Sequence, residues 1–335
     1  MGTKNIFFLL AVTLFMLDSC DSKKKPDESQ APKKIVQVPV FNADSAYFFV
    51  DRQVKFGPRV PNTKAHHDAS DYFIRLFKKY GATVVAQDFE AVTWDNQKVQ
   101  LKNIIASYNP DVQKRILLAA HWDTRPYADK DEEKKNSPFD GANDGASGVG
   151  VLLEISRLLG QGKLPSVGVD LILFDGEDWG EDSSTGQKSA IQLPDGYVDW
   201  WCLGSQYWAR HKHKKNYAAY YGVLLDMVGS NHAQFFREGP SLEFAPTIVE
   251  KVWNTASRLG YTDYFVKTNV GGITDDHVFV NKLGKIPMID IVHYQNGVGF
   301  FGDYHHSRKD NISLISKETL GAVGTTLMNV VYYEE

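Results

Sequence analysis

Four uninterrupted apolar runs constrain the fold of this chain more than any other feature. They are ILLAA at 116–120, VDLILF at 169–174, YGVLL at 221–225 and IPMIDIV at 286–292. Segments with helical spacing of apolar residues accompany them, at 145–160, 203–213, 241–259, 275–283 and 315–332. Unbroken apolar strands that alternate with helices are typical of a sheet covered on both faces. We therefore predict an α/β fold, with a single domain built on a central twisted, mixed but mostly parallel sheet flanked by helices on both faces.

Further elements are predicted ahead of this alternation. The sequence favours two helices, at 43–56 and 64–80, and a hairpin of two strands, at 82–94 and 97–107. Asn62 or Thr63 is suited to cap the second helix, and Gly81 is suited to end it. No internal repeat and no second low-complexity stretch interrupts the chain after its N-terminal region, which favours one domain.

The N-terminal segment has the features of an export signal. Lys4 precedes an apolar run at 6–17, which is too short to span a bilayer because a span needs about 20 residues. The run ends in LDSC, which resembles the lipobox of bacterial lipoproteins and implies lipidation of Cys20; a plain cleaved signal is the alternative. We predict a signal peptide at 1–19, a lipidated tether at 20–40 and a catalytic domain at 41–335. The protein would then be exported, facing the periplasm or the outer membrane, and held to the membrane only by its lipid.

Polar side chains follow three of the apolar runs directly. His121 follows the first, Asp175 follows the second and Asp226 follows the third. In open parallel sheets, ligands bind outside the carboxyl ends of the strands. We therefore expect the functional site at this edge of the sheet.

The second run leads into DGED, which brings Asp175, Glu177 and Asp178 together with no Lys or Arg before Lys188. Neighbouring carboxylates repel one another unless a positive charge lies among them, and a divalent metal supplies that charge. An acidic surface loop is the alternative interpretation. A calcium loop is disfavoured, because the alternating oxygen ligands of an EF-hand are absent.

Three dispersed residues form a candidate zinc set. Asp144 lies between glycines in GANDGASG (141–148), and His306 lies in YHHS (304–307), with His305 as the adjacent alternative. A catalytic zinc has three protein ligands and one position open to water or substrate, which Asp144, Asp178 and His306 would provide. Glu177 would then remain unbound beside the metal as a general base. A Cys-rich zinc site is excluded, because the chain has only two Cys.

Six motifs in a fixed order carry a family resemblance. They are HWD (121–123), GANDGASG (141–148), FDGED (174–178), LLDMVGS (224–230), TDDH (274–277) and YHHS (304–307). Together they resemble the M28-type zinc hydrolases, and within these the type II glutaminyl cyclases, including bacterial lipoprotein members. The resemblance runs from about Gly57 to the last predicted helix.

This resemblance implies an acyltransferase with one Zn²⁺ per chain, a glutaminyl-peptide cyclotransferase. It would convert the N-terminal Gln of peptides or proteins to pyroglutamate and release ammonia. It implies that Asp144, Asp178 and His306 hold the zinc, that Glu177 is the general acid and base, and that Asp226 and Asp275 form hydrogen bonds around the reaction centre. For the tryptophan that covers the substrate we favour Trp201, then Trp179, with Trp200 as a competitor.

The nearest alternative is a two-zinc aminopeptidase of the same superfamily. Its second metal would use His121 and Asp226 with Asp144 bridging, and all three residues are present. The paired acids of TDDH (274–277) and the insertion after Asp123 favour the cyclase, in which Asp123 would orient His121. A non-enzymatic binding module on this fold is disfavoured, because such modules usually lose ligand residues.

The net charge and the remaining histidines give further predictions about partners and burial. Lys plus Arg is 37 and Asp plus Glu is 41, so nothing favours a nucleic-acid partner, and we expect a monomer. His66 and His213 are predicted to be exposed in polar helix ends. His293 is predicted to be a hydrogen-bonded core residue, and Cys202 is left without an intrachain disulfide partner if Cys20 is lipidated.

Overall fold

A mixed six-stranded sheet forms the centre of the protein in the computed structural model, which describes residues 1–2, 36–181, 186 and 188–335. The strands are β1 (Thr83–Val92), β2 (Lys98–Tyr108), β3 (Arg115–His121), β4 (Gly168–Phe174), β5 (Tyr221–Asp226) and β8 (Met288–Val292). Their order is β1-β2-β4-β3-β5-β8. The four strands from β4 to β8 are parallel, and β1 and β2 add an antiparallel hairpin at one edge. The predicted fold class is therefore confirmed.

The predicted signal segment and Cys20 lie outside the described residues, except for the first two residues of the chain. Most of the predicted tether also lies outside them. Every described helix and strand belongs to the unit Gln37–Glu335. Within the described ranges, every helix is too short or too polar to traverse a lipid bilayer.

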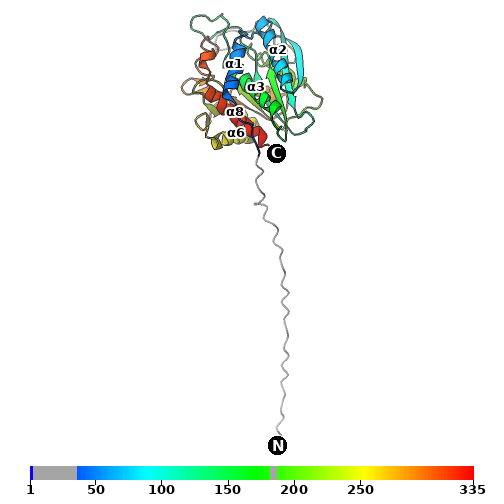
Figure 1. Cartoon of the computed structure of the whole chain (residues 1–335). Coiled ribbons are helices and arrows are strands. Elements are labelled where there is room, and N and C mark those ends of the chain that lie inside the picture. Colours follow the sequence, from blue (N-terminus) through cyan, green and yellow to red (C-terminus); the bar gives the residue numbers. More distant parts are fainter. Residues whose placement is uncertain (3–35, 182–185, 187) are drawn as a thin grey trace. The chain divides into compact units, whose positions relative to one another are not determined.

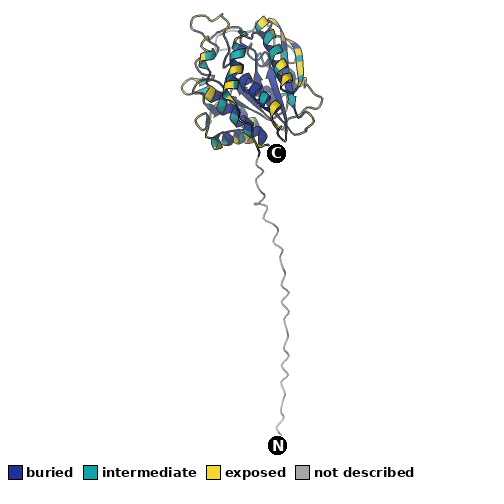
Figure 2. Ribbon diagram, viewed as in Figure 1, coloured by how far each residue is buried: buried dark blue, intermediate teal, exposed yellow. Residues whose placement is uncertain are grey.

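Helices cover both faces of the sheet. On one face α1 (Ala43–Val54), α3 (Ala146–Gln161) and α8 (Lys317–Tyr332) pack against one another, as Figure 1 shows. α2 (Lys64–Lys79) contacts the hairpin, and α6 (Pro246–Arg258) packs on α8. The opposite face carries α4 (Leu203–Arg210) and α7 (Asp276–Lys282). The strands β3, β4, β5 and β8 are buried along their whole length, whereas the edge strand β1 is largely exposed and the helices expose their outward faces (Figure 2).

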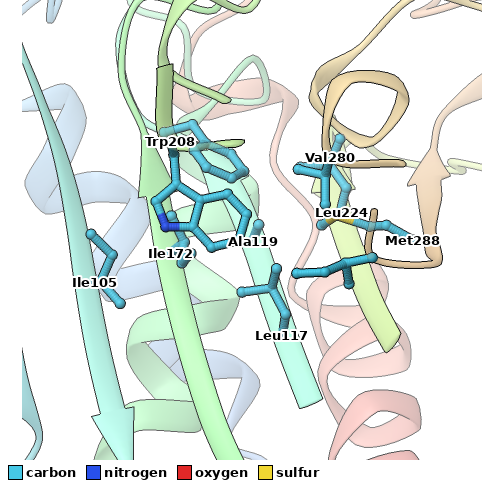
Figure 3. Packing of buried hydrophobic residues seen from close by; sticks show 10 residues of the cluster. Ile105, Leu117, Ala119, Ile172, Trp208, Leu224, Val280 and Met288 are labelled. Atoms are coloured by element: carbon cyan, nitrogen blue, oxygen red, sulfur yellow. The ribbon is translucent and has the colours of Figure 1, made fainter. Parts of the chain in front are cut away.

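The alternation of side chains along each strand explains why the predicted runs are apolar throughout. On β3, Leu117 and Ala119 face the α4 side, where Trp208 and Val280 cover them (Figure 3). Ala120 points to the other side, against α3. Both faces of a parallel strand are thus removed from water, which requires apolar residues at consecutive positions.

One predicted helix was wrong in its extent. The segment 241–259 folds as two helices, α5 (Gly239–Phe244) and α6, which meet at Ala245. Pro246 begins α6, and it cannot continue a preceding helix because it has no N–H and disfavours helical backbone at the residue before it. The second helix starts as predicted, because the Thr63 side chain accepts a hydrogen bond from the His66 amide.

Several short elements had no counterpart in the prediction. They are the paired strands β6 (Phe235–Arg237) and β7 (Phe265–Asn269), the paired strands β9 (Tyr294–Gln295) and β10 (Gly299–Phe300), and the 3₁₀ turn η3 (Ile312–Leu314). These four strands have two to five residues and, unlike β8, lack a continuous apolar run, so they have too little periodicity to be predicted from sequence alone.

Candidate active site and metal centre

The predicted polar residues do gather at the carboxyl edge of the sheet. His121 is the last residue of β3, Asp226 is the last residue of β5, and Glu177 lies in the turn after β4. A pocket of about 430 Å³ opens at this edge. It is lined by Lys130, Asp144, Glu177, Asp178, Glu181, Asp199, Trp200, Trp201, Asp226, Thr274, Asp275, Phe301, His305 and His306.

Asp144 reaches the pocket because a glycine-rich turn leads into α3. Gly145, the N-cap of α3, has a φ of 81°, which L side chains rarely adopt. A Cβ atom there would lie 3.0 Å from the carbonyl oxygen of Asp123 and 3.0 Å from Cε1 of His121. Glycine at this position lets the turn pass close to the end of β3.

Two buried side chains fix the same turn from outside the pocket. The carboxylate of Asp310 accepts hydrogen bonds from the amides of Asn143 (2.7 Å) and Asp144 (3.0 Å). The Arg59 guanidinium donates to the carbonyl oxygens of Asp140 and Gly141. The backbone that carries Asp144 is therefore held by the first and the last parts of the domain.

His306 lies near both of the carboxylates that are predicted to hold zinc with it. Nε2 of His306 lies 2.9 Å from Oδ1 of Asp178 and 3.6 Å from Oδ2 of Asp144. Both carboxylate oxygens are buried without a hydrogen-bond partner. Ligand atoms on a tetrahedral zinc lie about 3.3 Å apart, so each of these two pairs fits such an ion, whereas a set whose ligand atoms all lie within 4.8 Å of one another is Asp144, His305 and His306. His305 is also close, with its Nε2 3.8 Å from Oδ2 of Asp144.

A second set of donors also meets in the pocket. Atoms of His121, Asp144 and Asp226 all lie within 4.8 Å of one another. Nε2 of His121 is 3.0 Å from Oδ1 of Asp144 and 3.3 Å from Oδ1 of Asp226. Burial lowers the pKa of His121, but hydrogen bonds to the surrounding aspartates outweigh it and raise the pKa well above its usual value. The geometry suits either a second metal or an imidazolium that neutralises both carboxylates.

Asp123 holds the turn that carries Glu177 and Asp178. Its two oxygens accept hydrogen bonds from the amides of Glu177 and Asp178, each 3.1 Å long. Its Oδ1 lies 3.6 Å from Nδ1 of His121. Asp123 therefore fixes the turn after β4 relative to β3.

Glu177 is not one of the residues predicted to hold zinc, and its Oε2 lies 4.0 Å from Nδ1 of His121. Oε1 of Glu177 accepts a hydrogen bond from Sγ of Cys202 (3.3 Å), and its side chain is 13% exposed, toward the pocket that it lines. Burial, reinforced by the charges of Asp275 and Asp178, raises its pKa well above the usual value. This is the environment expected of a carboxyl group that exchanges protons.

Other acids beside Glu177 are also buried. Burial, together with neighbouring carboxylates, raises the pKa of Asp226 to about 6, that of Asp275 to about 7 and that of Asp276 to about 8. Asp275 caps α7 through a hydrogen bond from the amide of Asp276. Asp275 and Asp276 are therefore partly or mostly protonated near neutral pH, and a protonated carboxyl group can donate a hydrogen bond to a polar ligand.

The three candidate tryptophans lie in two different environments. Trp201 lines the pocket, donates from Nε1 to the carbonyl oxygen of Glu181 (2.9 Å) and stacks on His306 with ring centroids 6.1 Å apart. Trp200 lines the pocket as well. Trp179 is instead buried in a hydrophobic cluster with Phe89 and other residues. The expectation that Trp179 contacts substrate is therefore not supported, because its ring packs into the core.

The prediction that His66 is exposed was wrong. Its ring is buried and stacks on Trp122 at 4.3 Å, and its Nε2 lies 2.9 Å from both oxygens of Asp175. Asp175 thus points away from the pocket. His213 is also half-buried, where it accepts a hydrogen bond from Nε1 of Trp208. The polar residues next to each histidine in the sequence favoured an exposed side chain. The partners that bury the two rings lie outside the helical turn of each histidine, so the local sequence did not indicate them.

Comparisons with known proteins agree with this geometry. The sequence pattern of Peptidase family M28 matches residues 103–331. The structure of a Zn-dependent exopeptidase from Parabacteroides distasonis ATCC 8503 has a TM-score of 0.83 and 48% identity, over 89% of this chain and 100% of that one. The structure of Bacteroides thetaiotaomicron glutaminyl cyclase bound to N-acetylhistamine has a TM-score of 0.83 and 46% identity, over the same shares.

Curated relatives are more distant. The glutaminyl-peptide cyclotransferase of Drosophila melanogaster is 23% identical over 291 residues, which cover 78% of this chain and 73% of that protein. Another curated relative is 34% identical over 110 residues, and the chain spans only 31% of its length. The family pattern covers more than half of this chain, and the two structural relatives match over their full lengths. This chain therefore belongs to peptidase family M28.

Proposed function

We propose that this protein is a zinc-dependent glutaminyl-peptide cyclotransferase, which converts the N-terminal Gln of peptides or proteins to pyroglutamate and releases ammonia. The observation that carries the proposal is the similarity to a bacterial glutaminyl cyclase over that protein's whole length. The pocket is consistent with it, since it places a free carboxylate beside a candidate metal set and an aromatic wall.

One zinc per chain would be held by Asp144, Asp178 and His306. Their buried oxygens without partners and the adjacent imidazole nitrogen form a donor set suited to zinc. A zinc ion bound there would act as a Lewis acid on the side-chain carbonyl of the substrate Gln. His121 would neutralise Asp144 and Asp226 directly, in place of a second metal.

Glu177 would move the proton in the reaction. It accepts a proton from the α-amine of the substrate as the amine nitrogen attacks the side-chain carbonyl carbon. A carbon–nitrogen bond forms within the same molecule, and the bond to the side-chain amide nitrogen breaks. Glu177 returns the proton to that nitrogen, which leaves as ammonia. Because nucleophile and electrophile belong to one residue, correct positioning supplies much of the rate.

The remaining pocket residues would hold the substrate in the reactive shape. Asp275, with a pKa raised to about 7, is partly protonated near neutral pH and can therefore donate a hydrogen bond to the reacting amide, whereas Asp226 would stay ionised beside His121. Trp201 and Trp200 provide a flat apolar wall for the aliphatic part of Gln.

A two-zinc aminopeptidase is the second candidate function. The convergence of His121, Asp144 and Asp226 favours it, and one structural relative is named as a Zn-dependent exopeptidase. Zinc stoichiometry of the purified protein separates the two functions. One zinc per chain supports the cyclase, and two support the peptidase.

The proposed activity is tested by incubating the pure protein with a peptide that begins with Gln, followed by mass spectrometry. We expect a product lighter by one ammonia and no free amino acid. A matched peptide that begins with Ala should remain unchanged. Release of the first residue from either peptide would overturn the cyclase assignment in favour of the peptidase.

We also propose that the protein is a monomeric exported lipoprotein, with a signal peptide at 1–19, a tether at 20–40 attached through Cys20, and a catalytic domain at 41–335. The order of the N-terminal motifs supports this. Metabolic labelling with a fatty-acid analogue should mark the wild-type chain but not the Cys20→Ser variant. Equal labelling of both would contradict attachment at Cys20.

A further inference from the structure

The chain between the end of β3 and Asp144 forms an insertion loop (residues 124–142) that contacts the metal-binding region. Within it, Oδ1 of Asp129 lies 3.4 Å from Nδ1 of His306. Asp129 is 6% exposed, and its Oδ1 has no hydrogen-bond partner among the described residues. Nδ1 of His306 is likewise buried without a hydrogen-bond partner there. The two atoms face each other on the side of the ring opposite the candidate metal position.

The residues after Asp129 hold the backbone at His306 and two residues beyond it. The amide of Lys130 donates to the carbonyl oxygen of His306 (3.2 Å). Asp131 accepts hydrogen bonds from the amide, Nε and one terminal nitrogen of Arg308, all within 3.1 Å. His306 has a φ of 51°, a left-handed conformation that residues with a Cβ seldom adopt. These contacts keep His306 in that conformation.

Asp129 is itself fixed by Arg125, which reaches other parts of the pocket. Nε and a terminal nitrogen of Arg125 donate to Oδ2 of Asp129 (2.9 and 2.7 Å). The amide of Arg125 donates to Oδ2 of Asp178 (2.8 Å), and its guanidinium lies 4.9 Å from the ring centre of Trp201. One buried ion pair thus joins two candidate zinc ligands to the aromatic wall.

We propose that Asp129 is a positioning residue for the metal centre. It accepts the Nδ1–H of His306, and so fixes the ring orientation and the tautomer that leaves Nε2 free to bind zinc. This inference rests on the zinc set of the proposed function. Carboxylates that orient metal-binding histidines in this way raise metal affinity about 10- to 100-fold.

The test measures zinc affinity by competition with a chromophoric chelator, which does not depend on turnover. Asp129→Asn should weaken zinc binding about 10- to 100-fold, because it removes the charge that faces Nδ1 of His306. Glu133→Gln is the matched control. It removes one carboxylate from the same loop, where the exposed side chain of Glu133 pairs with Arg308 at the surface. The control should bind zinc as the wild type does.

A second measurement distinguishes positioning from general stability. The visible spectrum of the cobalt-substituted protein should change in Asp129→Asn, because the imidazole orientation changes, and should stay the same in Glu133→Gln. Wild-type zinc affinity and an unaltered cobalt spectrum in Asp129→Asn would overturn the inference. An equal loss of zinc affinity in Glu133→Gln would overturn it too.

Failure of the inference and failure of the proposed function give different results. If the wild type does not cyclise Gln peptides while Asp129→Asn still loses zinc affinity, the role of Asp129 stands and the cyclase assignment falls. If the wild type cyclises Gln peptides and Asp129→Asn binds zinc normally, only the role of Asp129 falls.

Discussion

Neighbouring carboxylates in the pocket differ in role because their hydrogen-bond partners differ. Asp123 accepts from two backbone amides, so it is committed to holding the turn after β4. Asp178 is bonded through one oxygen to the amide of Arg125, and its other oxygen faces His306. Glu177 has a thiol partner and faces the pocket, which leaves it available for proton transfer.

At this scale, Glu177→Gln tests the proposed proton carrier. We expect kcat for Gln peptides to fall by at least about 100-fold, because an amide cannot accept and return the proton. Zinc stoichiometry should be unchanged, since Glu177 is not among the proposed ligands. Steady-state kinetics and metal analysis check both statements, and substantial turnover by this variant would contradict the assigned role.

The thiol beside Glu177 gives a second prediction. Cys202→Ala removes a hydrogen bond to Oε1 of Glu177, and we expect kcat to fall about fivefold, as for a loss of about 1 kcal/mol. Cys202→Ser keeps a donor and should recover most of the rate. Kinetics at saturating peptide measure this effect. If alanine and serine behaved alike, the hydrogen bond would have no part in turnover.

The elements place these residues through their ends. β3, β4 and β5 end at the same edge of the sheet, and the turn after β4 meets the start of α4. There the amide of Cys202 donates to the carbonyl oxygen of Glu177 (3.0 Å), and the amide of Leu203 donates to that of Gly176 (2.9 Å). The N-terminus of the helix therefore holds the turn that carries Glu177, and the helix packs on the sheet through Trp208.

The far end of α4 makes stability depend on pH. Burial lowers the pKa of His213 from 6.5 to about 4, and its neutral ring accepts a hydrogen bond from Trp208. Between pH 6.5 and pH 4 the unfolded chain binds a proton that the folded chain does not, so this contribution is complete above pH 6.5 and falls as the pH drops toward 4.

This loss amounts to at most about 3 kcal/mol, reduced by the partial exposure of the ring. His213→Gln keeps an acceptor for Trp208 but does not titrate. We expect its unfolding free energy, measured with denaturant across this pH range, to decline less steeply than that of the wild type. Parallel curves would show that His213 does not contribute to the pH dependence.

At the scale of the whole molecule, the buried carboxylates lie where residues from the early and the late parts of the domain sequence meet. Arg59 and Asp310 fix the Asp144 turn, and His306 is supplied by the chain just before α8. Residues far apart in the sequence thus build one site. Binding a cation there should stabilise the whole fold, since a ligand that binds only the folded state adds to its stability.

Metal removal tests that coupling. We expect a chelator to lower the thermal unfolding midpoint, because buried carboxylates then lack their counter-charge. At free zinc 100 times its dissociation constant the difference is about 2.7 kcal/mol. Restoring zinc should restore the midpoint, and His306→Ala should lose most of the zinc-dependent shift. An identical midpoint with and without zinc would exclude this metal as a stabilising ligand.

The sequence alone determined the class of fold and the edge of the sheet where the site lies. Both follow from local patterns: apolar runs must be buried on two faces, and the polar residues that end parallel strands must share one edge. Motif order also indicated the family and the residues that would hold zinc. Apolar runs and motif order can be identified from the sequence because they depend on residues that are consecutive or close together in the chain.

Only the tertiary structure decided which polar groups contact one another. Asp175 pairs with His66 and does not line the pocket, and Asp129 of the insertion loop faces His306. Trp179 lies in the core, whereas Trp201 lines the pocket. Each contact joins segments far apart in the chain and depends on how helices and loops pack over the sheet. Side-chain types and spacing do not specify that packing, because it arises from the simultaneous burial of many residues.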